Sequence, residues 1–244
     1  MKLIKRSIPS PALGTARMAW LEPSGAVSKP LCIFLDGELY LNMVGAKKIV
    51  SKVRKEGILK DRRCVFVSYG TIAERHEDFA CDPRYSRFLV KELIPAITEA
   101  RKVPDGGHML VGLSLSGLAA IFIAIRFPQV FPKTISQSPS AWWDGEWLSQ
   151  HMGKRSLRDS RFWVSVGSKE TDTDVRHAPG LHQQTSQLDS SRRLAAALRE
   201  KHGNVRFSIF DGGHQMECWG NELPNALRWA EGPLRPSSTV QPTS

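Results

Sequence analysis

The sequence lacks several features that would place the protein in a membrane or outside the cell. No apolar run approaches the length that spans a bilayer, and the basic residues within positions 1–9 are not followed by the apolar segment of a secretory signal. Cysteine is scarce, and no CxxC pair occurs among the four residues, which are Cys32, Cys64, Cys81 and Cys218. Their spacing matches neither a zinc site nor a disulfide scaffold. We therefore expect a cytoplasmic protein with reduced thiols that does not enter membranes.

Recognition motifs for nucleic acid are also missing, although the formal net charge is +10. There is no RNP-like motif, zinc finger or obvious recognition helix, so we expect no nucleic-acid partner. A positive surface that steers an anionic small-molecule substrate is one alternative. Surface Lys and Arg that keep the protein in solution are the simpler one. The net charge alone therefore does not decide the function.

The length and the order of apolar segments favour one α/β domain. The 244 residues suffice for a single large domain, which we expect over 1–231, and the Pro-, Ser- and Thr-rich end at 232–244 is typical of a disordered tail. The expected strands cover 31–35, 64–67, 108–111, 133–136, 162–166 and 205–210. The expected helices cover 41–54, 85–101 with a kink at Pro95, 115–127, 185–201 and 218–229, with a polar loop from 68 to 83. This alternation predicts an α/β-hydrolase-type fold, a mostly parallel sheet with helices on both faces.

One candidate nucleophile, Ser114, lies between an expected strand and an expected helix. It stands in the run Gly112-Leu113-Ser114-Leu115-Ser116-Gly117, which is close to the GxSxG pattern of a nucleophile elbow. Such an elbow exposes the serine hydroxyl above the sheet, and its small neighbours prevent clashes. The alternative is that Ser114 only caps the helix. We favour the elbow, and we expect Ser116 to point away from the strand end.

A candidate base and acid follow later strands in the order that α/β-hydrolases use. His214 comes after the last expected strand, in a Gly-Gly-His turn. Three carboxylates follow the strand that ends near 166, and one of them could orient the imidazole. We favour Glu170, with Asp172 second, and Asp174 completes the set. A Ser–His dyad without an acid is the remaining alternative.

Two backbone N–H groups are expected to bind the oxyanion of an acyl-transfer reaction. One belongs to Leu115, directly after the nucleophile. The other is expected from Glu38, in the Asp36-Gly37-Glu38 turn after the first central strand, where Gly37 would permit an unusual backbone conformation. These residues together predict a serine hydrolase of carboxylic esters that needs no metal and no organic cofactor.

Several segments resemble the enterochelin esterase branch of the esterase D-like hydrolases. They are residues 34–40, 75–95, the elbow, 136–143 and 211–219. The segment 136–143 contains a Ser-Gln-Ser motif and a Trp-Trp pair, and 211–219 contains Gly-Gly-His and Trp219. The match runs in the same order over roughly 16–229. The sequence departs from the family at Ser116, where the family usually has Gly, and at Gln215, where it often has Asp. The cytoplasmic members also carry an extra N-terminal domain, which we do not expect in this chain.

The resemblance implies a substrate class and further site residues. The family hydrolyses esters of catecholate siderophores, trimers of dihydroxybenzoyl-serine that are often bound to iron, so the substrate would be small, anionic and aromatic. Arg75 would meet catecholate or carboxylate oxygens, and Trp142, Trp143 and Trp219 would stack on rings or line the pocket, with core packing as their alternative role. Alternative functions are a general carboxylesterase, a feruloyl esterase or thioesterase, and a siderophore-binding protein without catalysis. Neither the oligomeric state nor an approach of Cys81 to Cys218 follows from the sequence.

Overall fold

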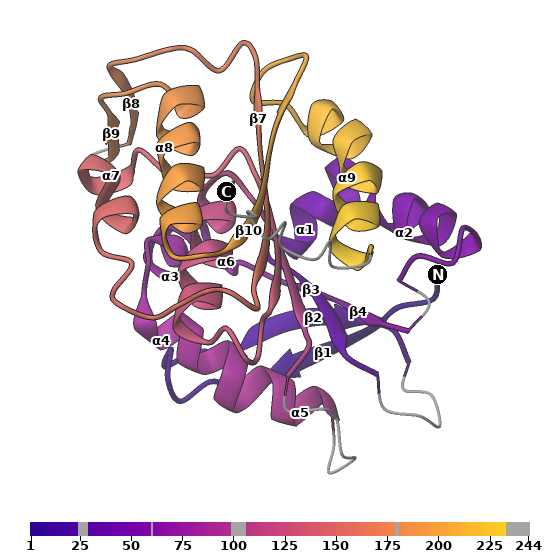
Figure 1. Ribbon diagram of the computed structural model, residues 1–244. Coiled ribbons are helices and arrows are strands. Elements are labelled where there is room, and N and C mark those ends of the chain that lie inside the picture. Colours follow the sequence, from indigo (N-terminus) through magenta and orange to yellow (C-terminus); the bar gives the residue numbers. More distant parts are fainter. Residues whose placement is uncertain (24–28, 60, 99–105, 179–180, 233–244) are drawn as a thin grey trace, which may run out of the picture.

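The protein is built around one eight-stranded sheet (Figure 1). The computed structural model describes residues 1–23, 29–59, 61–98, 106–178 and 181–232. The strand order is β1-β2-β4-β3-β5-β6-β7-β10, with β1 and β2 antiparallel and the other six strands parallel to one another. The strands are β1 (Ile4–Ile8), β2 (Arg17–Leu21), β3 (Leu31–Phe34), β4 (Arg63–Val67), β5 (Met109–Leu113), β6 (Lys133–Gln137), β7 (Arg161–Gly167) and β10 (Asn204–Phe210). A separate hairpin consists of β8 (Val175–Ala178) and β9 (Leu181–Gln183).

Helices cover both faces of the sheet (Figure 1). One face carries α3 (Ile72–Phe79), α4 (Pro83–Arg87), the π-helical turn η2 (Phe88–Leu93), α5 (Ile94–Thr98), α6 (Ser114–Arg126), α7 (Trp143–Gln150) and α8 (Gln187–Glu200). The other carries α1 (Gly37–Leu39), the π-helical turn η1 (Tyr40–Val44), α2 (Ala46–Lys55) and α9 (Met216–Glu231). This is the predicted α/β-hydrolase-type fold.

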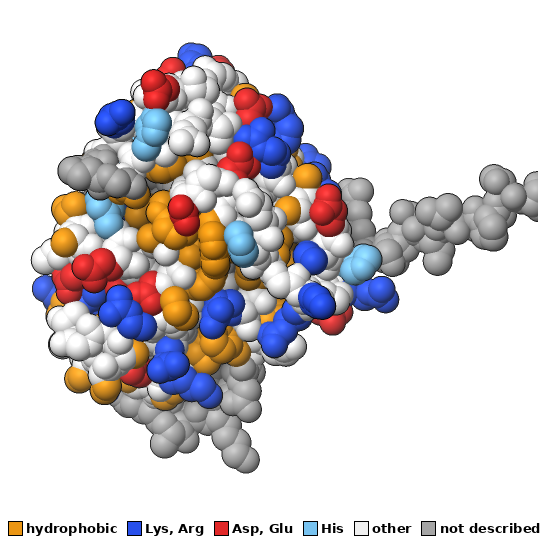
Figure 2. Space-filling model, turned by 90° about the vertical axis from the view of Figure 1, so that its left-hand side faces the viewer, with side chains coloured by type: hydrophobic (Ala, Val, Ile, Leu, Met, Phe, Trp, Pro, Cys, Tyr) orange, Lys and Arg blue, Asp and Glu red, His pale blue; other side chains and the backbone are white. Residues whose placement is uncertain are grey.

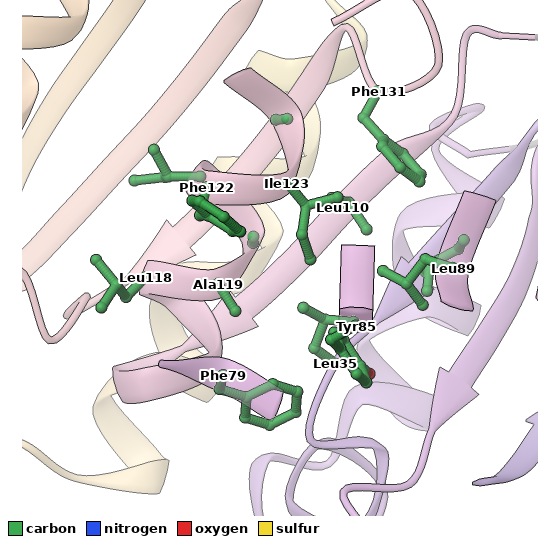
Figure 3. Close-up of a cluster of buried hydrophobic side chains, with 14 of the residues drawn as sticks. Leu35, Phe79, Tyr85, Leu89, Leu110, Leu118, Ala119, Phe122, Ile123 and Phe131 are labelled. Carbon is green, nitrogen blue, oxygen red and sulfur yellow. The ribbon is translucent and has the colours of Figure 1, made fainter. Parts of the chain in front are cut away.

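The core on the α6 side fixes the position of the turn that precedes this helix. Leu115 through Ile125 are buried without a break, so α6 has no solvent-facing stripe and lies between the sheet and the outer helices. Leu118, Phe122 and Ile123 pack in one apolar cluster with Leu110 of β5 and Phe79 of α3 (Figure 3). Each such side chain contributes about 1.5–3 kcal/mol when fully buried. The end of β5 and the start of α6 are therefore held rigidly.

The six parallel strands were predicted within one or two residues, and the differences from expectation lie elsewhere. The strands β1, β2, β8 and β9 were not predicted. The segment expected as one kinked helix is divided by η2, where the Ile94 N–H donates to the Leu89 carbonyl just before Pro95, which has no N–H to donate. The helix expected over 41–54 is interrupted at Gly45, whose φ is +76°. The expected tail at 233–244 lies outside the described residues.

Helix α3 occupies the segment that was expected to be a loop, so that prediction was wrong. Its polar composition concealed it, since the segment buries little besides Phe79 and Asp78. Thr71 and Glu74 form a reciprocal capping box at its start, and Arg17 of β2 pairs with the buried Asp78 at 2.8 Å. Burial raises the pKa of Asp78 to about 6 despite this pairing. The helix matters because it carries Arg75 and His76 to the site described next.

Candidate active site

Ser114 occupies a strained turn between β5 and α6. Its φ is +52°, a left-handed conformation that non-glycine residues adopt only where the surrounding structure enforces it. Gly112 makes the turn feasible, because a Cβ there would lie 2.2 Å from the carbonyl oxygen of Ser116. The helix cap is Leu113, so Ser114 does not serve as the N-cap residue. This strand–turn–helix geometry is that of a nucleophile elbow.

Ser116 explains how the elbow tolerates a serine where the usual pattern has glycine. Its hydroxyl donates to the Leu113 carbonyl at 2.8 Å and accepts from the Leu113 N–H at 3.0 Å. The side chain is fully buried, and it turns toward the end of β5 instead of away from it, so the expected direction was wrong. It therefore satisfies the N–H and the carbonyl of Leu113, the cap residue of α6.

His214 reaches Ser114 from the loop after β10. Its Nε2 lies 2.9 Å from Ser114 Oγ, although the two residues are 100 positions apart in the chain. Gly212, with φ +136°, forms the bend before it, and the Gly212 carbonyl accepts from the Lys169 N–H at 2.9 Å. That bond connects the histidine loop to the loop after β7. The imidazole packs edge-on against Trp219, with ring centroids 4.8 Å apart.

Glu170, in the loop after β7, is the carboxylate that meets His214. Its Oε2 lies 2.6 Å from His214 Nδ1, and its side chain is only 3% exposed. Its Oε1 accepts from Ser138 Oγ at 2.6 Å and from the Gly167 N–H at 2.8 Å. Asp172, the second candidate, is exposed and lies along the pocket wall instead. The structure thus brings Ser114, His214 and Glu170 into one hydrogen-bonded row.

The two N–H groups expected to bind an oxyanion both lie in the first turn of a helix. Leu115 follows Ser114 in α6, and Glu38 is the second residue of α1, positions whose N–H groups have no acceptor within the helix. In the turn between β3 and α1, the residue with the unusual backbone conformation is Asp36, whose φ is +53°. The sequence had suggested Gly37 for this role. Gly37 is required for a different reason, because a Cβ there would lie 2.8 Å from the backbone of Phe66.

Arg75 lines the pocket but is bound to Asp36. Its Nε and Nη2 donate to the two carboxylate oxygens of Asp36 at 2.7 and 2.6 Å, and Asp36 is fully buried. A bidentate pair of this kind fixes both partners. Arg75 therefore holds the turn that carries the Glu38 N–H, in addition to bordering the pocket.

A pocket of about 310 Å³ opens over Ser114 and His214. Its wall combines apolar, amide and charged side chains from six segments, namely Arg75, His76, Leu115, Ser140, Trp142, Lys169, Glu170, Asp172, Val175, His177, Leu181, Gln183 and Gln187. The face that carries α7 and the β8–β9 hairpin shows a hollow with apolar side chains at its centre and both signs of charge around it (Figure 2). Such a mixture suits a compact ligand with an apolar body and polar edges.

The three tryptophans expected at the substrate take different positions. Trp142 lines the pocket, stacked on His177 at 4.9 Å and bound through Nε1 to Gln187 at 2.5 Å. Trp219 is 1% exposed, so the expectation that it lines the pocket is wrong, because it packs behind His214. Trp143 packs edge-on against Trp147 and is not part of the described pocket wall.

The β8–β9 hairpin is one part of the pocket that the sequence did not reveal, and His76, Ser140 and Gln187 are further lining residues that were not predicted. The hairpin contributes Val175, His177, Leu181 and Gln183. Its strands are short and carry no regular apolar alternation, so periodicity gives no signal. Gln183 anchors it by donating to the Asp172 carbonyl at 2.9 Å.

All four cysteines are free thiols, and Cys81 and Cys218 are not bonded to each other. Burial raises the pKa of Cys81 to about 12. Within the described residues, no group of three His, Cys, Asp or Glu side chains could hold a metal ion. In the same part of the chain, no helix combines the length and the apolar character needed to cross a bilayer.

Comparisons with known proteins place these features in context. A family model described as "Putative esterase" matches residues 13–230. The iron(III) enterobactin esterase of Dickeya dadantii is 23% identical over 229 residues, covering 90% of this chain and 53% of the relative. The chain thus spans about half the length of the curated relatives it matches.

Solved structures show the same fold. The enterobactin esterase of Shigella flexneri, crystallised in the presence of enterobactin, superposes with a TM-score of 0.79 at 21% identity, over 93% of this chain and 58% of that one. A ferulic acid esterase superposes with a TM-score of 0.73 at 17% identity and covers 94% of this chain and 97% of its own.

Proposed function

The chain belongs to the putative esterase family, and on that premise we propose that it is a serine hydrolase of carboxylic esters. Ser114 is the nucleophile, His214 the general base and Glu170 the acid that orients His214. The observation that carries the proposal is the row of two contacts, 2.9 Å from Ser114 Oγ to His214 Nε2 and 2.6 Å from His214 Nδ1 to Glu170 Oε2.

The first half-reaction forms an acyl-enzyme. His214 Nε2 removes the Ser114 proton while Ser114 Oγ attacks the ester carbonyl, and the N–H groups of Glu38 and Leu115 hold the oxyanion. His214 then gives that proton to the leaving alcohol as the C–O bond breaks. The buried Glu170 carboxylate stabilises the imidazolium that forms between these two steps.

The second half-reaction releases the acid. A water molecule takes the position of the alcohol, loses a proton to His214 and attacks the acyl carbonyl. The oxyanion collapses, Ser114 Oγ leaves and regains the proton from His214, and the carboxylic acid departs. His214, whose side chain is 44% exposed, borders the open pocket from which this water enters.

Labelling and activity of Ser114→Ala test the assignment. We expect the wild type to react with a fluorophosphonate probe, and the variant to lose labelling and about 10⁴-fold or more in kcat. Ser51→Ala, which changes a serine on α2 outside the pocket, is the control and keeps both. Labelling or turnover that survives in Ser114→Ala would remove Ser114 as the nucleophile.

For the substrate, we propose an ester of a catecholate siderophore, a small anionic and aromatic molecule. Support comes from relatives that are iron(III) enterobactin and salmochelin esterases, and from the pocket wall, which contains the exposed Lys169 together with the apolar side chains of Trp142 and Leu115. A general carboxylesterase, a feruloyl esterase and a thioesterase use the same machinery. Turnover of a ferric triscatecholate ester, measured beside p-nitrophenyl butyrate and a feruloyl ester, separates these substrates.

Lys169→Gln sharpens the substrate test, because Lys169 is exposed along the pocket, whereas removal of Arg75 would also strand the buried Asp36 carboxylate. For an anionic substrate we expect KM to rise while KM for neutral p-nitrophenyl butyrate stays the same. An equal effect on both esters would argue against recognition of an anion.

A further inference from the structure

Two motifs noted in the sequence, Ser-Gln-Ser before the Trp-Trp pair and the tryptophan after Gly-Gly-His, meet behind the triad. The second serine of the first motif is Ser138, directly after β6, and the tryptophan is Trp219 in α9. Trp219 Nε1 donates to Ser138 Oγ at 2.9 Å, and Ser138 Oγ lies 2.6 Å from Glu170 Oε1. Neither side chain lines the pocket, so neither contacts substrate.

The chemistry of these groups fixes the direction of each hydrogen bond. An indole N–H can only donate, so Ser138 Oγ accepts from Trp219 and its own hydrogen points to Glu170. Glu170 Oε1 then receives two donors, the Ser138 hydroxyl and the Gly167 N–H, and Oε2 remains for His214 Nδ1. His214 must carry its proton on Nδ1, which leaves the Nε2 lone pair facing Ser114.

The backbone of Ser138 is held in a strained conformation that serves this contact. Its φ is +44° and the residue is fully buried. The Ser138 N–H donates to the Ser165 carbonyl at 2.7 Å, and Gln187 Nε2 donates to the Ser138 carbonyl at 2.5 Å. Strain of this kind persists only where the surroundings over-determine it, and it concentrates at functional sites.

We propose that Ser138, itself oriented by Trp219, is a positioning residue that fixes the rotamer of Glu170 and thereby the tautomer of His214. The inference deepens the proposed function and rests on it. It assigns a role to the Ser-Gln-Ser and Gly-Gly-His…Trp segments that their positions in the sequence could not supply. Its effect falls on the rate of the chemical steps, since the residue touches no substrate.

A pair of substitutions separates the hydroxyl from the backbone. Ser138→Gly removes the hydroxyl and suits the positive φ, whereas Ser138→Ala removes it and keeps the strain. We expect both to lower kcat by a similar factor, on the order of 10²-fold, with KM unchanged. Ser136→Ala is the control, because Ser136 is also buried in β6 but donates to the Gly117 carbonyl at 2.8 Å. It is expected to keep its kcat.

Proton NMR gives a readout that does not depend on turnover. The hydrogen shared by His214 Nδ1 and Glu170 is expected to give a far-downfield resonance in wild type and Ser136→Ala that Ser138→Gly and Trp219→Phe shift or broaden. Trp219→Phe also covers the case in which Ser138 variants fail to fold, because it removes the donor behind Ser138 and leaves Ser138 itself unchanged; it also shortens the buried ring that packs against His214. An unchanged resonance in the folded variants, or a loss that appears in KM and not in kcat, would overturn the proposal. A wild type that hydrolyses no ester would instead defeat the proposed function, and the resonance would still decide whether Ser138 orders the row.

Discussion

Two glutamates are buried near Trp219, and their surroundings differ. Glu170 meets His214 at 2.6 Å, and that histidine opens to the pocket. Glu222, on α9, is 7% exposed and accepts from Gln137 Nε2 and Trp163 Nε1. Among the described residues no cation pairs with it. Trp219 joins both clusters, because its indole reaches Ser138 and its carbonyl accepts from Gln137 at 2.9 Å.

The difference shows that burial alone does not make a carboxylate part of a reaction. Both carboxylate oxygens of Glu170 accept hydrogen bonds, and the donor to Oε2 is the solvent-accessible imidazole of His214. The hydrogen-bond partners of Glu222 are themselves buried. One of them, Gln137, also accepts from the buried Tyr40 hydroxyl at 3.0 Å. Burial raises the pKa of Glu222 to about 7. We therefore expect changes at Glu170 to appear in activity and changes at Glu222 to appear in stability.

Of the changes that test the difference between Glu170 and Glu222, Glu170→Gln is expected to have the largest effect, a loss of kcat. The Gly167 N–H and the Ser138 hydroxyl both need an acceptor, so the amide oxygen turns to them and the NH₂ group faces His214 Nδ1. His214 then carries its proton on Nε2, where it cannot accept from Ser114. The loss in kcat is about 10⁴-fold, as for the equivalent change in other triads. Steady-state kinetics with p-nitrophenyl butyrate measures it.

Asp172→Asn is the matched control for that variant. Asp172 lies in the same loop and borders the pocket, but the carboxylate in contact with His214 is that of Glu170. With a neutral ester we expect a change of no more than a few-fold. A larger loss in Asp172→Asn than in Glu170→Gln would show that the second candidate from the sequence is the acid.

The sequence could predict the parts of the fold that depend on short-range pattern. The buried strands at 31–35 and 108–111 are continuous apolar runs, and the elbow combines a strand, a small turn and a helix within a few residues. The contact between residues 114 and 214 could be expected because parallel strands deliver their carboxyl ends to one edge of the sheet.

Other features could not be predicted because they depend on partners distant in the sequence. Helix α3 is polar, and what fixes it is the pairing of Asp78 with Arg17, 61 residues away. Trp219 was predicted to line the pocket, and its hydrogen bond to the distant Ser138 could not be foreseen. Arg75 was predicted to meet the substrate, and its bidentate pairing with Asp36 could not be foreseen. In each case the residue type indicated a site, and only the fold showed which partner the residue meets.

The next effect in size is that of Glu222→Gln on the pH dependence of stability. The pKa of Glu222 is raised from 4.5 to about 7 in the folded protein, so between these values the folded state binds more protons than the unfolded state. The contribution of Glu222 to the free energy of unfolding is therefore fully present below pH 4.5. It is lost as the pH rises through 7, by about 3 kcal/mol in total. The variant lacks this loss. Urea unfolding of both proteins from pH 4 to 8 measures the difference.

Because all other groups titrate in both proteins, their contributions cancel in the difference between the two unfolding free energies. That difference should move in favour of Glu222→Gln as pH rises, while kcat stays within a few-fold of wild type. A difference that is flat across the range would contradict the raised pKa. A loss of activity as large as that of Glu170→Gln would remove the distinction between the two clusters.

The smallest effect, and the closest match between the clusters, comes from Trp163→Phe. Trp163 donates its indole N–H to Glu222 as Trp219 donates its own to Ser138, so each Trp→Phe change removes one donor from one cluster, together with part of one buried ring. Loss of a donor to a buried acceptor costs about 1–3 kcal/mol. The cost should be greater above pH 7 than below pH 4.5, because the ionised carboxylate depends most on that donor. Trp163→Phe is therefore expected to lower the unfolding free energy and leave kcat intact, whereas Trp219→Phe lowers kcat. A fall in kcat for Trp163→Phe as large as that for Trp219→Phe would show that the two glutamates belong to one cooperative network through Trp219, and the separation of reaction from stability would not hold.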